Sequence, residues 1–292
     1  MTDKTLFYQE SGRVDALRLL LVYLVSLVIV LVMFYAYSAA SLFLYNVYAN
    51  VGIIVFFSIS LGYYVKVLLR IAHIRSARNR YILAIVLGLM ANYFQWTTFI
   101  LYALDNEIPT FIHLLENLDW IIVPSTFFSI IAAINEVGVW ELFGVQFHGF
   151  ELGLIWVIEA LAIMAGPIIA VYNTRVYPFS EEFKRWYPKF TLRNHFQSIA
   201  TVLKLTENLQ EDPLKTIQEL KMGDGIRHTR IHVYYLEHEE NQYLTFEKVF
   251  IDKRGEGKKR STFIIHNFKV STDVAKSILD AYDYKRERIE II

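Results

Sequence analysis

The sequence predicts an α-helical polytopic membrane protein that carries a C-terminal cytosolic α+β domain. The first observation is composition: 54% of the 292 residues are hydrophobic and the mean hydropathy is +0.33, above that of an ordinary soluble domain. The second is distribution, because the long apolar runs fall within residues 1–175 and reach the roughly 20 residues that cross a bilayer. The third is the pattern of residues 191–292, where β-branched and aromatic residues form strand-like runs.

Four apolar runs predict four transmembrane helices in residues 1–175. They are Ala16–Tyr37, a span within Tyr48–Leu69, Tyr81–Leu104 and Leu152–Tyr172. The first run is too long for the apolar core of a cleavable signal peptide, so we expect a retained span. Aromatic side chains at the outer ends of the first two spans predict an interfacial belt; they are Tyr35, Tyr37, Tyr45 and Tyr48.

Lysine and arginine lie on one side of this four-span arrangement. They occur before or at the start of the first span, between the second and third spans, and after the fourth. The outer segment 105–151 has none, but it has seven acids: Asp105, Glu107, Glu116, Asp119, Glu136, Glu141 and Glu151. Because basic loops stay in the cytosol, both termini are expected there.

The outer segment is apolar but interrupted by acids and by Pro124. We expect interfacial helices lying on the outer leaflet. A re-entrant hairpin buried among the spans is the second choice, since irregular backbone is tolerated at membrane depth only when protein covers it. A fifth span near residues 118–134 is disfavoured, because it would move the basic C-terminal part outside.

Glu159 is an acidic residue inside the fourth predicted span. At 1.5 Å per residue it lies about 5 Å outward from the midplane, at the depth of Gln95 in the antiparallel third span, with Asn92 nearer the midplane. A charge at this depth costs at least about 2.5 to 3.5 kcal/mol. The sequence favours a protonated Glu159 that forms a hydrogen bond with Gln95, Asn92 or a backbone carbonyl. The alternative is a proton- or ion-coupling carboxylate.

Small residues in the second and third spans permit close helix packing. They are Gly52, Ser58, Ser60, Gly62, Gly88 and Ala91. Packing explains them, and no function is assigned to them. Gly166-Pro167 is a candidate kink in the fourth span.

Residues 176–190 form a predicted juxtamembrane junction, and residues 191–292 the α+β domain. A helix is expected over 192–205, and a second one starts with Asp212 as N-cap and Pro213 at the first position. Runs at 226–236, 242–252 and 260–268 predict a three-stranded antiparallel sheet, and a final helix starts at Ser271 or Thr272 and runs to 287. The predicted core is Ile231, Val233, Leu244, Phe246, Phe250, Ile264, Phe268, Ile278 and Leu279.

Other candidate sites are weaker. A basic loop could contact a membrane surface or an anion, although a solvated turn is favoured; it contains Lys253, Arg254, Lys258, Lys259 and Arg260. His228 and His232 share one face of a strand, with His238 and His266 nearby, but no acid or cysteine is spaced with them as a metal site requires. Gly255 and Gly257 predict a hairpin turn.

An enzyme acting at the outer surface would need convergent groups from the outer segment. The candidates are His113, Glu116, Asp119, Glu136, Trp140 and His148. The chain has no cysteine, which excludes disulfides and thiolate chemistry. No catalytic motif is present either, so we predict no catalytic residue, no metal and no cofactor.

The membrane half resembles an uncharacterised multi-span inner-membrane protein family of Bacteroidota. The resemblance rests on INEVGVWELFG, HGF and LGLIWVIEALAIMAGP, together with RSARNR and NYFQW, and covers residues 50 to about 190. Its characteristic residues are Asn135, Gly138, Trp140, Gly144, Gly149, Trp156, Glu159 and Gly166. The resemblance implies a bacterial inner (cytoplasmic) membrane and no particular chemistry.

The leading hypothesis is a membrane-anchored interaction, scaffold or sensor protein that presents the cytosolic domain, as a subunit of a larger complex or a homo-oligomer. The expected partners are the lipid bilayer and another protein, and no nucleic acid. A transporter or channel component that uses Glu159 is the alternative.

Overall fold

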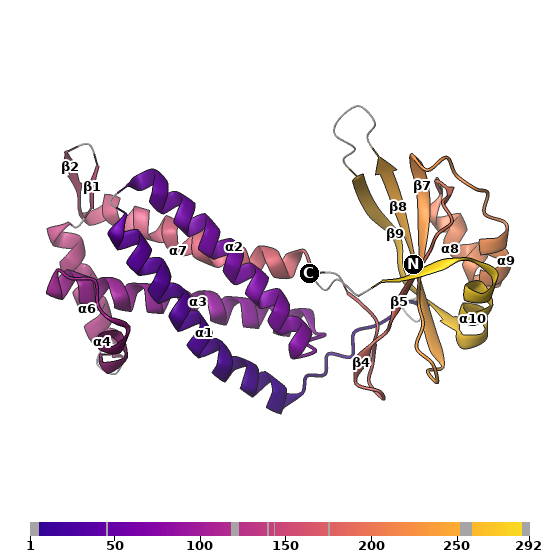
Figure 1. Cartoon of the computed structure of the whole chain (residues 1–292), viewed down its shortest axis with the longest axis horizontal. Helices are drawn as coiled ribbons and strands as arrows, with labels where there is room; N and C mark the ends of the chain where they lie inside the picture. The colour runs from indigo at the N-terminus through magenta and orange to yellow at the C-terminus, as the bar shows by residue number, and fades with distance from the viewer. Residues whose placement is uncertain are drawn as a thin grey trace. The chain divides into compact units, whose positions relative to one another are not determined.

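The computed structural model describes residues 6–44, 46–117, 123–138, 140–142, 144–174, 176–251 and 259–287, with backbone alone at 47, 124, 140–142 and 259. These residues form two compact units. Residues 11–174 make a helical bundle, and residues 6–10 together with 176–287 make an α+β unit (Figure 1). The N-terminal residues join the α+β unit because Phe7 packs edge-on against Phe268 and the Tyr8 amide donates to the Asn267 carbonyl.

Four helices of the described residues are long and apolar enough to span a membrane: α1 (Ala16–Phe43), α2 (Val47–Ile71), α3 (Ala77–Asp105) and α7 (Gly149–Tyr172). Side-chain caps start two of them, since Asp15 accepts from the Arg18 amide and Asn46 from the Ala49 amide. α1 packs on α2 and α3, and α7 packs on the same two helices. The four predicted spans are therefore present in one bundle.

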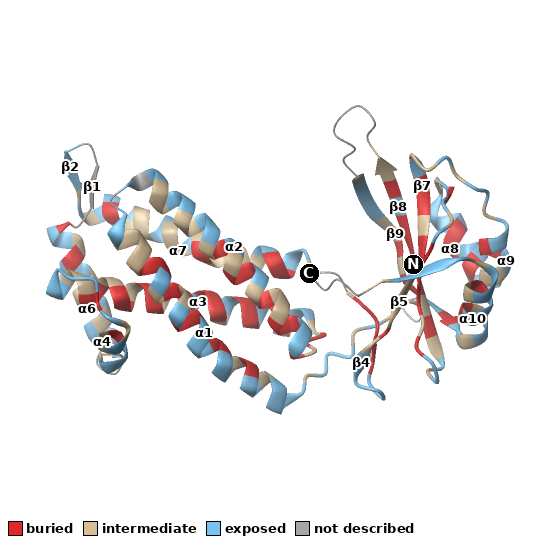
Figure 2. Cartoon of the chain, in the orientation of Figure 1, coloured by how far each residue is buried: buried red, intermediate tan, exposed pale blue. Residues whose placement is uncertain are grey.

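The outward faces of these helices carry large exposed apolar side chains, such as Leu20, Leu24 and Phe56, while the interior is buried (Figure 2). Such a continuous apolar surface is unusual for a soluble protein. The helices therefore suggest a membrane protein. α1 extends to Phe43 rather than Tyr37, because the residues after Tyr37 include no Pro or Gly to end the helix.

Small residues bring α2 and α7 into close contact, as predicted for Ser58 and Gly62. A Cβ on Gly62 would lie 2.6 Å from the Gly166 carbonyl oxygen, and one on Gly166 would overlap the Ser58 carbonyl. The Ser58 hydroxyl donates to the Ala162 carbonyl at 2.7 Å and accepts from the Gly166 amide at 3.0 Å. Ser58 thus bonds to two backbone groups of α7 beside Pro167. A Cβ on Gly52, by contrast, would meet no described atom within 4 Å outside its own helical turn.

Between α3 and α7 the chain forms α4 (Phe111–Glu116), α6 (Pro124–Val137) and a hairpin of β1 (Trp140–Leu142) and β2 (Val145–Phe147). α6 has 14 residues, a length of about 21 Å at 1.5 Å per residue, which is short for a span. This described part of the outer segment therefore contains short elements and no helix of spanning length.

Six strands of the described α+β unit form one antiparallel sheet in the order β10-β5-β7-β8-β9, with β6 also paired to β7. They are β5 (Lys189–Leu192), β6 (Phe196–Gln197), β7 (Arg227–Tyr234), β8 (Asn241–Ile251), β9 (Lys259–Ser271) and β10 (Tyr284–Glu287). A small hairpin of β3 (Phe179–Ser180) and β4 (Arg185–Trp186) precedes them. The predicted three-stranded sheet is therefore too small, although its strands β7, β8 and β9 are confirmed.

Three helices pack on one face of the sheet: α8 (Val202–Glu211), α9 (Pro213–Gln218) and α10 (Thr272–Ala281) (Figure 1). The predicted starts of α9 at Pro213 and α10 at Thr272 are confirmed. The helix expected over 192–205 is wrong for residues 192–201, and only its last four residues belong to α8. Leu192 and Phe196 instead pair as strands beside β7, so their helix-like spacing comes from two short strands that each place one residue in the core.

The predicted final helix stops at Ala281, and Tyr284–Glu287 pairs with β5 instead. Of the predicted core residues, Phe250, Ile264 and Leu279 are only partly buried. The register between β8 and β9 shifts near Phe246, and Asn267 has a left-handed φ of 54°. This bulge puts Ile265, rather than Ile264, in the core opposite Phe246.

Candidate functional site

Glu159 lies inside the bundle, ten residues from the start of α7 (159 − 149), and Gln95 lies ten residues from the end of α3 (105 − 95). Both positions are therefore about 15 Å from the same end of the bundle. The Gln95 side-chain amide donates to Glu159 Oε1 at 2.7 Å. The predicted hydrogen bond between these two helices is confirmed.

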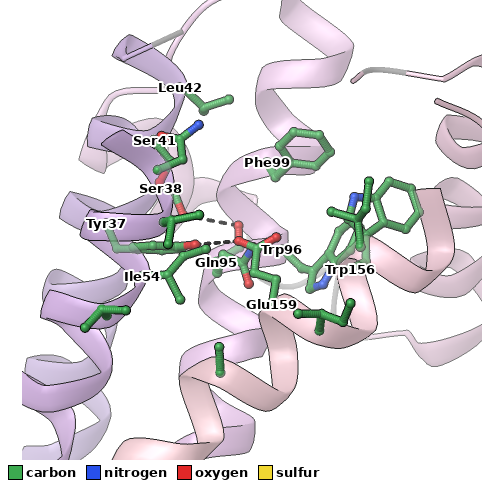
Figure 3. Close-up of a pocket in the computed structure, with 16 residues that line it drawn as sticks. Tyr37, Ser38, Ser41, Leu42, Ile54, Gln95, Trp96, Phe99, Trp156 and Glu159 are labelled. Atoms are coloured by element: carbon green, nitrogen blue, oxygen red, sulfur yellow. Dashed lines mark hydrogen bonds between the residues drawn. The ribbon is translucent and has the colours of Figure 1, made fainter. Parts of the chain in front are cut away.

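Tyr37 of α1 completes the cluster, because its hydroxyl donates to the same Glu159 oxygen (Figure 3). Only 1% of Tyr37 is exposed, and its ring packs between Phe34 and Phe57 at centroid distances of 5.6 and 5.5 Å. The prediction that Tyr37 belongs to an interfacial belt is thus wrong. Because α1 continues for six more residues, Tyr37 lies inside the bundle and not at its end. Its hydroxyl therefore reaches Glu159 of α7.

A cavity of about 290 Å³ adjoins this cluster, between α1, α2, α3 and α7. Trp96, Phe99 and Trp156 lie along it (Figure 3), and the two indole rings meet edge to face with centroids 4.7 Å apart. Polar groups also reach it from Ser38, Ser41 and Asn50. Glu159 is the one acidic side chain among the described residues that line the cavity, and no lysine, arginine or histidine lines it there.

Two buried amide oxygens and one buried hydroxyl of this cavity lack a hydrogen-bond partner among the described residues: Gln95 Oε1, Asn50 Oδ1 and Ser41 Oγ. Gln95 is 8% exposed. A buried acceptor without a hydrogen bond costs roughly 1 to 3 kcal/mol, so such groups at a cavity indicate a place for a ligand or water. The arrangement therefore offers a carboxylate and two amide oxygens to a molecule that donates hydrogen bonds.

Asn92 has a structural role. Its side-chain amide donates to the Gly88 carbonyl at 2.9 Å, within α3, and to the Ala160 carbonyl of α7 at 3.5 Å. It does not line the cavity. Of the three predicted intramembrane polar residues, Glu159 and Gln95 thus belong to the cavity and Asn92 supports the adjacent helix contact.

A second polar cluster lies in the sheet, around His232 on β7. Its Nδ1 is 2.8 Å from Thr191 Oγ1, and its Nε2 is 3.1 Å from Glu247 Oε2. Burial lowers the pKa of His232, against the opposing effect of the hydrogen bond to Glu247. A neutral imidazole that donates to the carboxylate from Nε2 accepts at Nδ1, so the Thr191 hydroxyl donates to it.

This chain of a hydroxyl, an imidazole and a carboxylate matches a catalytic triad in residue type. However, Thr191 is 6% exposed and His232 is 1% exposed, so a substrate has no access to the hydroxyl. Nearby, Lys189 pairs with Glu287 at 2.8 Å. Burial raises the pKa of Glu287, but the hydrogen bond and charge of Lys189 outweigh this effect and hold the pKa below its usual value. The cluster joins β10, β5, β7 and β8 as a structural network.

The other candidate histidines do not form a metal site in the described part of the chain, where no group of three metal-ligating side chains occurs. His228 stacks on His195 at 4.0 Å between ring centroids and contacts the Gly225 carbonyl through Nδ1. His238 is exposed in the turn after β7, and His266 packs against Phe263.

The outer-surface candidates do not converge in the described residues. His113 lies 3.7 Å from Asp105, while Glu116, Glu136 and His148 are exposed. None of these lines the cavity of the bundle. Asp119 and the side chain of Trp140 lie outside the described residues.

Of the basic loop, only the end is described. Lys253, Arg254 and Lys258, with the turn at Gly255 and Gly257, lie outside the described residues, as does the side chain of Lys259. Arg260 is exposed on β9. An anion or membrane contact by this loop stays a prediction.

Sequence reasoning did not assign Tyr37, Asn50 or Trp96 to a site, and it gave no role to Ser38, Ser41 or Phe99 either. Asn50 and Trp96 had a usable signal, since each lies in a predicted span at the same end as Glu159. The depth of Tyr37 could be predicted only from the true end of α1, because that end sets how deep Tyr37 lies in the bundle. Trp96, within NYFQW, and Trp156 enter the sequence analysis only through the resemblance to a membrane family.

The chain matches no protein family model, no curated protein and no solved structure. The resemblance of the membrane half to a bacterial membrane family stays a prediction. The class that the fold defines is therefore broad: a candidate four-span membrane protein with a separate α+β unit and a polar cavity within its bundle.

Proposed function

We propose that this chain is a membrane-anchored sensor and interaction protein of a bacterial inner membrane. In this proposal the bundle spans the bilayer with both chain ends in the cytosol, its cavity receives a small molecule, and the α+β unit contacts a protein partner or a second copy. The observation that carries the proposal is the carboxylate-bearing cavity within a bundle whose chain continues into a separately packed unit.

The charges of the loops support the orientation. Arg70, Arg75 and Arg78 lie at or beside the α2–α3 turn, at the end of the bundle where the N-terminal residues enter and α7 ends. The opposite end, with α4, α6 and the β1–β2 hairpin, has no lysine or arginine. Basic loops remain on the cytosolic side of a membrane.

The orientation can be tested directly because the chain has no cysteine of its own. Glu107→Cys lies just after α3 and Glu207→Cys on α8, and both positions are exposed. A membrane-impermeant maleimide should label Glu107→Cys in intact spheroplasts and Glu207→Cys only after permeabilisation. Labelling of Glu207→Cys from outside would contradict the proposal.

The sensor role is tested by cross-linking the full-length protein in its native membrane, followed by mass spectrometry. The proposal predicts reproducible cross-links from exposed lysines of the α+β unit, such as Lys204 and Lys276, to another chain. Their yield should change when Glu159→Gln alters the cavity, and Glu151→Gln, an exposed acid in the first turn of the same helix, should leave it unchanged. An absence of cross-links to any other chain, or equal yields in both variants, would remove the support for this role.

Proton- or ion-coupled transport is the second candidate, and one observation favours it: Glu159 borders a cavity instead of a sealed helix contact. Intramembrane carboxylates frequently mark ion and proton pathways. In proteoliposomes, this function predicts a pH- or ion-driven flux that Glu159→Gln abolishes. Absence of flux in the wild-type protein would exclude it and leave the sensor proposal intact.

A further inference from the structure

The cavity beside Glu159 is lined by oxygens that accept hydrogen bonds, which favours a ligand that donates them. Glu159 Oε1 already accepts from Tyr37 and Gln95, and Gln95 Oε1 and Asn50 Oδ1 receive no donor from the described residues. The cavity is thus rich in acceptors. A ligand that only accepts hydrogen bonds would leave these oxygens unsatisfied, whereas an ammonium group has three donors and no acceptor.

The charge of the cavity points to the same chemistry. Glu159 lines it, and no lysine, arginine or histidine is present among the described lining residues. A carboxylate inside a bilayer requires a cation or a proton as its partner. The indole rings of Trp96 and Trp156 lie in the same cavity and offer apolar surface to the rest of such a ligand.

The shape of the cavity indicates how a ligand enters. Val51, Val55 and Ile158 line it and are also exposed on the outer surface of the bundle. These side chains belong to the apolar surface that suggests contact with lipid. A ligand therefore enters from the lipid, and the part that follows its polar head is apolar.

We propose that the cavity binds a lipophilic amine in its protonated form, with the ammonium group at Glu159, Gln95 and Asn50 and the apolar part against Trp96 and Trp156. The volume of about 290 Å³ suits a small arylalkyl amine. This inference rests on the proposed function, since the amine would be the input of the sensor. Binding can nevertheless be measured without any protein partner.

The test uses the full chain in nanodiscs of zwitterionic lipid and radiolabelled 4-phenylbutylamine as the probe, measured by equilibrium dialysis. Empty nanodiscs give the amount that partitions into lipid. The wild-type protein should bind saturably, with one amine per chain. 4-Phenylbutan-1-ol has the same skeleton with a hydroxyl in place of the ammonium, and it should compete at least about tenfold more weakly, as loss of a charged hydrogen bond implies.

Glu159→Gln is the decisive variant. A glutamine at this position keeps an oxygen that accepts from Tyr37 and Gln95, so the helix contacts persist while the negative charge is removed. Amine affinity should fall at least about tenfold. Glu151→Gln removes a charge from the same helix away from the cavity and should bind like the wild type.

Asn50→Leu provides a second variant that leaves the Glu159 cluster intact, and it should weaken amine binding about threefold to tenfold. The proposal is overturned if the wild type shows no saturable binding, if the alcohol competes as well as the amine, or if Glu159→Gln and Asn50→Leu both bind like the wild type. Loss of this proposal would leave the cross-links of the α+β unit unaffected. Absence of those cross-links, with amine binding intact, would overturn the sensor role alone.

Discussion

The polar network of the sheet and the polar cluster beside the bundle cavity differ in how their hydrogen bonds are satisfied. In the sheet, the side chain of Gln242 bonds to the Leu236 amide and to two carbonyls, and His232 has a partner at each ring nitrogen. In the bundle, Gln95 and Asn50 each keep an acceptor without a donor in the described residues, next to a cavity. Satisfied networks hold a structure together, whereas unsatisfied groups beside a cavity indicate binding.

This difference distinguishes a structural polar cluster from a candidate binding site where residue type alone would mislead. A hydroxyl, an imidazole and a carboxylate in sequence around His232 look catalytic, yet their burial makes them structural. A glutamate, a glutamine and a tyrosine around Glu159 look like a plain helix contact, yet they border a space that can be occupied. Whether a ligand can reach a polar cluster, and whether the cluster has unmade hydrogen bonds, therefore indicates function better than residue type does.

The largest loss of stability is expected from Gly166→Ala, which tests how closely α2 and α7 pack in the bundle. The new Cβ would overlap the Ser58 carbonyl of α2, and backbone there cannot move aside easily. The free energy of unfolding in mixed micelles should fall by about 3 kcal/mol. Gly52→Ala is the matched control on α2, because its Cβ meets no described atom within 4 Å outside its own helical turn, and it should be neutral or slightly stabilising.

Glu159→Ala sharpens the comparison by removing the acceptor at the centre of the bundle cluster. Tyr37 and Gln95 would each lose their hydrogen bond to Glu159, and the free energy of unfolding should fall by about 2 kcal/mol. Glu159→Gln keeps both hydrogen bonds and should lose less than half as much. Equal losses in the two variants, measured in the same micelles, would show that the charge and not the acceptor stabilises the cluster.

Gln242→Ala makes the corresponding test in the sheet. Its side chain is fully buried, and the substitution leaves the Leu236 amide without its acceptor, while the Glu239 carbonyl keeps only the Thr272 hydroxyl. The expected loss is about 1.5 kcal/mol, seen as faster amide exchange in peptides of β7 and β8. Gln210→Ala, on the exposed side of α8, should change exchange little. If both variants behave alike, the Gln242 network is not structural.

The smallest expected effect is the pH dependence of the stability of the sheet around His232. The pKa of His232 is lowered in the folded protein, mainly by burial, so the unfolded chain binds a proton at a higher pH than the folded chain does. Stability is therefore complete above the unfolded pKa of about 6.5 and declines as pH falls below it. Amide exchange of β7 in the full chain, corrected for intrinsic rates, should rise between pH 7.5 and 5.5. His238→Asn, in an exposed left-handed turn, should not alter this rise, whereas His232→Gln should reduce it.

Much of the bundle could be predicted from sequence because a helix in lipid satisfies its own backbone and only needs length and apolarity. The depth match of Gln95 with Glu159 followed from the rise per residue alone. Tyr37 could not be placed, because its depth depends on where α1 ends, and the six helical residues after it carry only a weak helix-ending signal. The cavity could not be foreseen at all, because a void depends on the packing of four helices together.

The sheet was harder to predict because its edge strands are short and are defined by their partners. β7, β8 and β9 carry strong local signals. Lys189–Leu192 becomes a strand by pairing with β7, and Tyr284–Glu287 becomes one by pairing with Lys189–Leu192. The bulge at Asn267 likewise depends on the opposing strand, and it moved the core position from Ile264 to Ile265. Such non-local pairing is absent from any single stretch of sequence.

The central claim, that the bundle and not the sheet holds the ligand site, is tested most directly by photolabelling. The full chain in lipid nanodiscs would be irradiated with a primary amine that carries a diazirine, and the modified residues identified by mass spectrometry. The account predicts label on peptides that contain Trp96 and Trp156, removed by excess 4-phenylbutylamine and absent in Glu159→Gln. Label on peptides around His232, or label spread over the exposed face of α1 without competition, would contradict it.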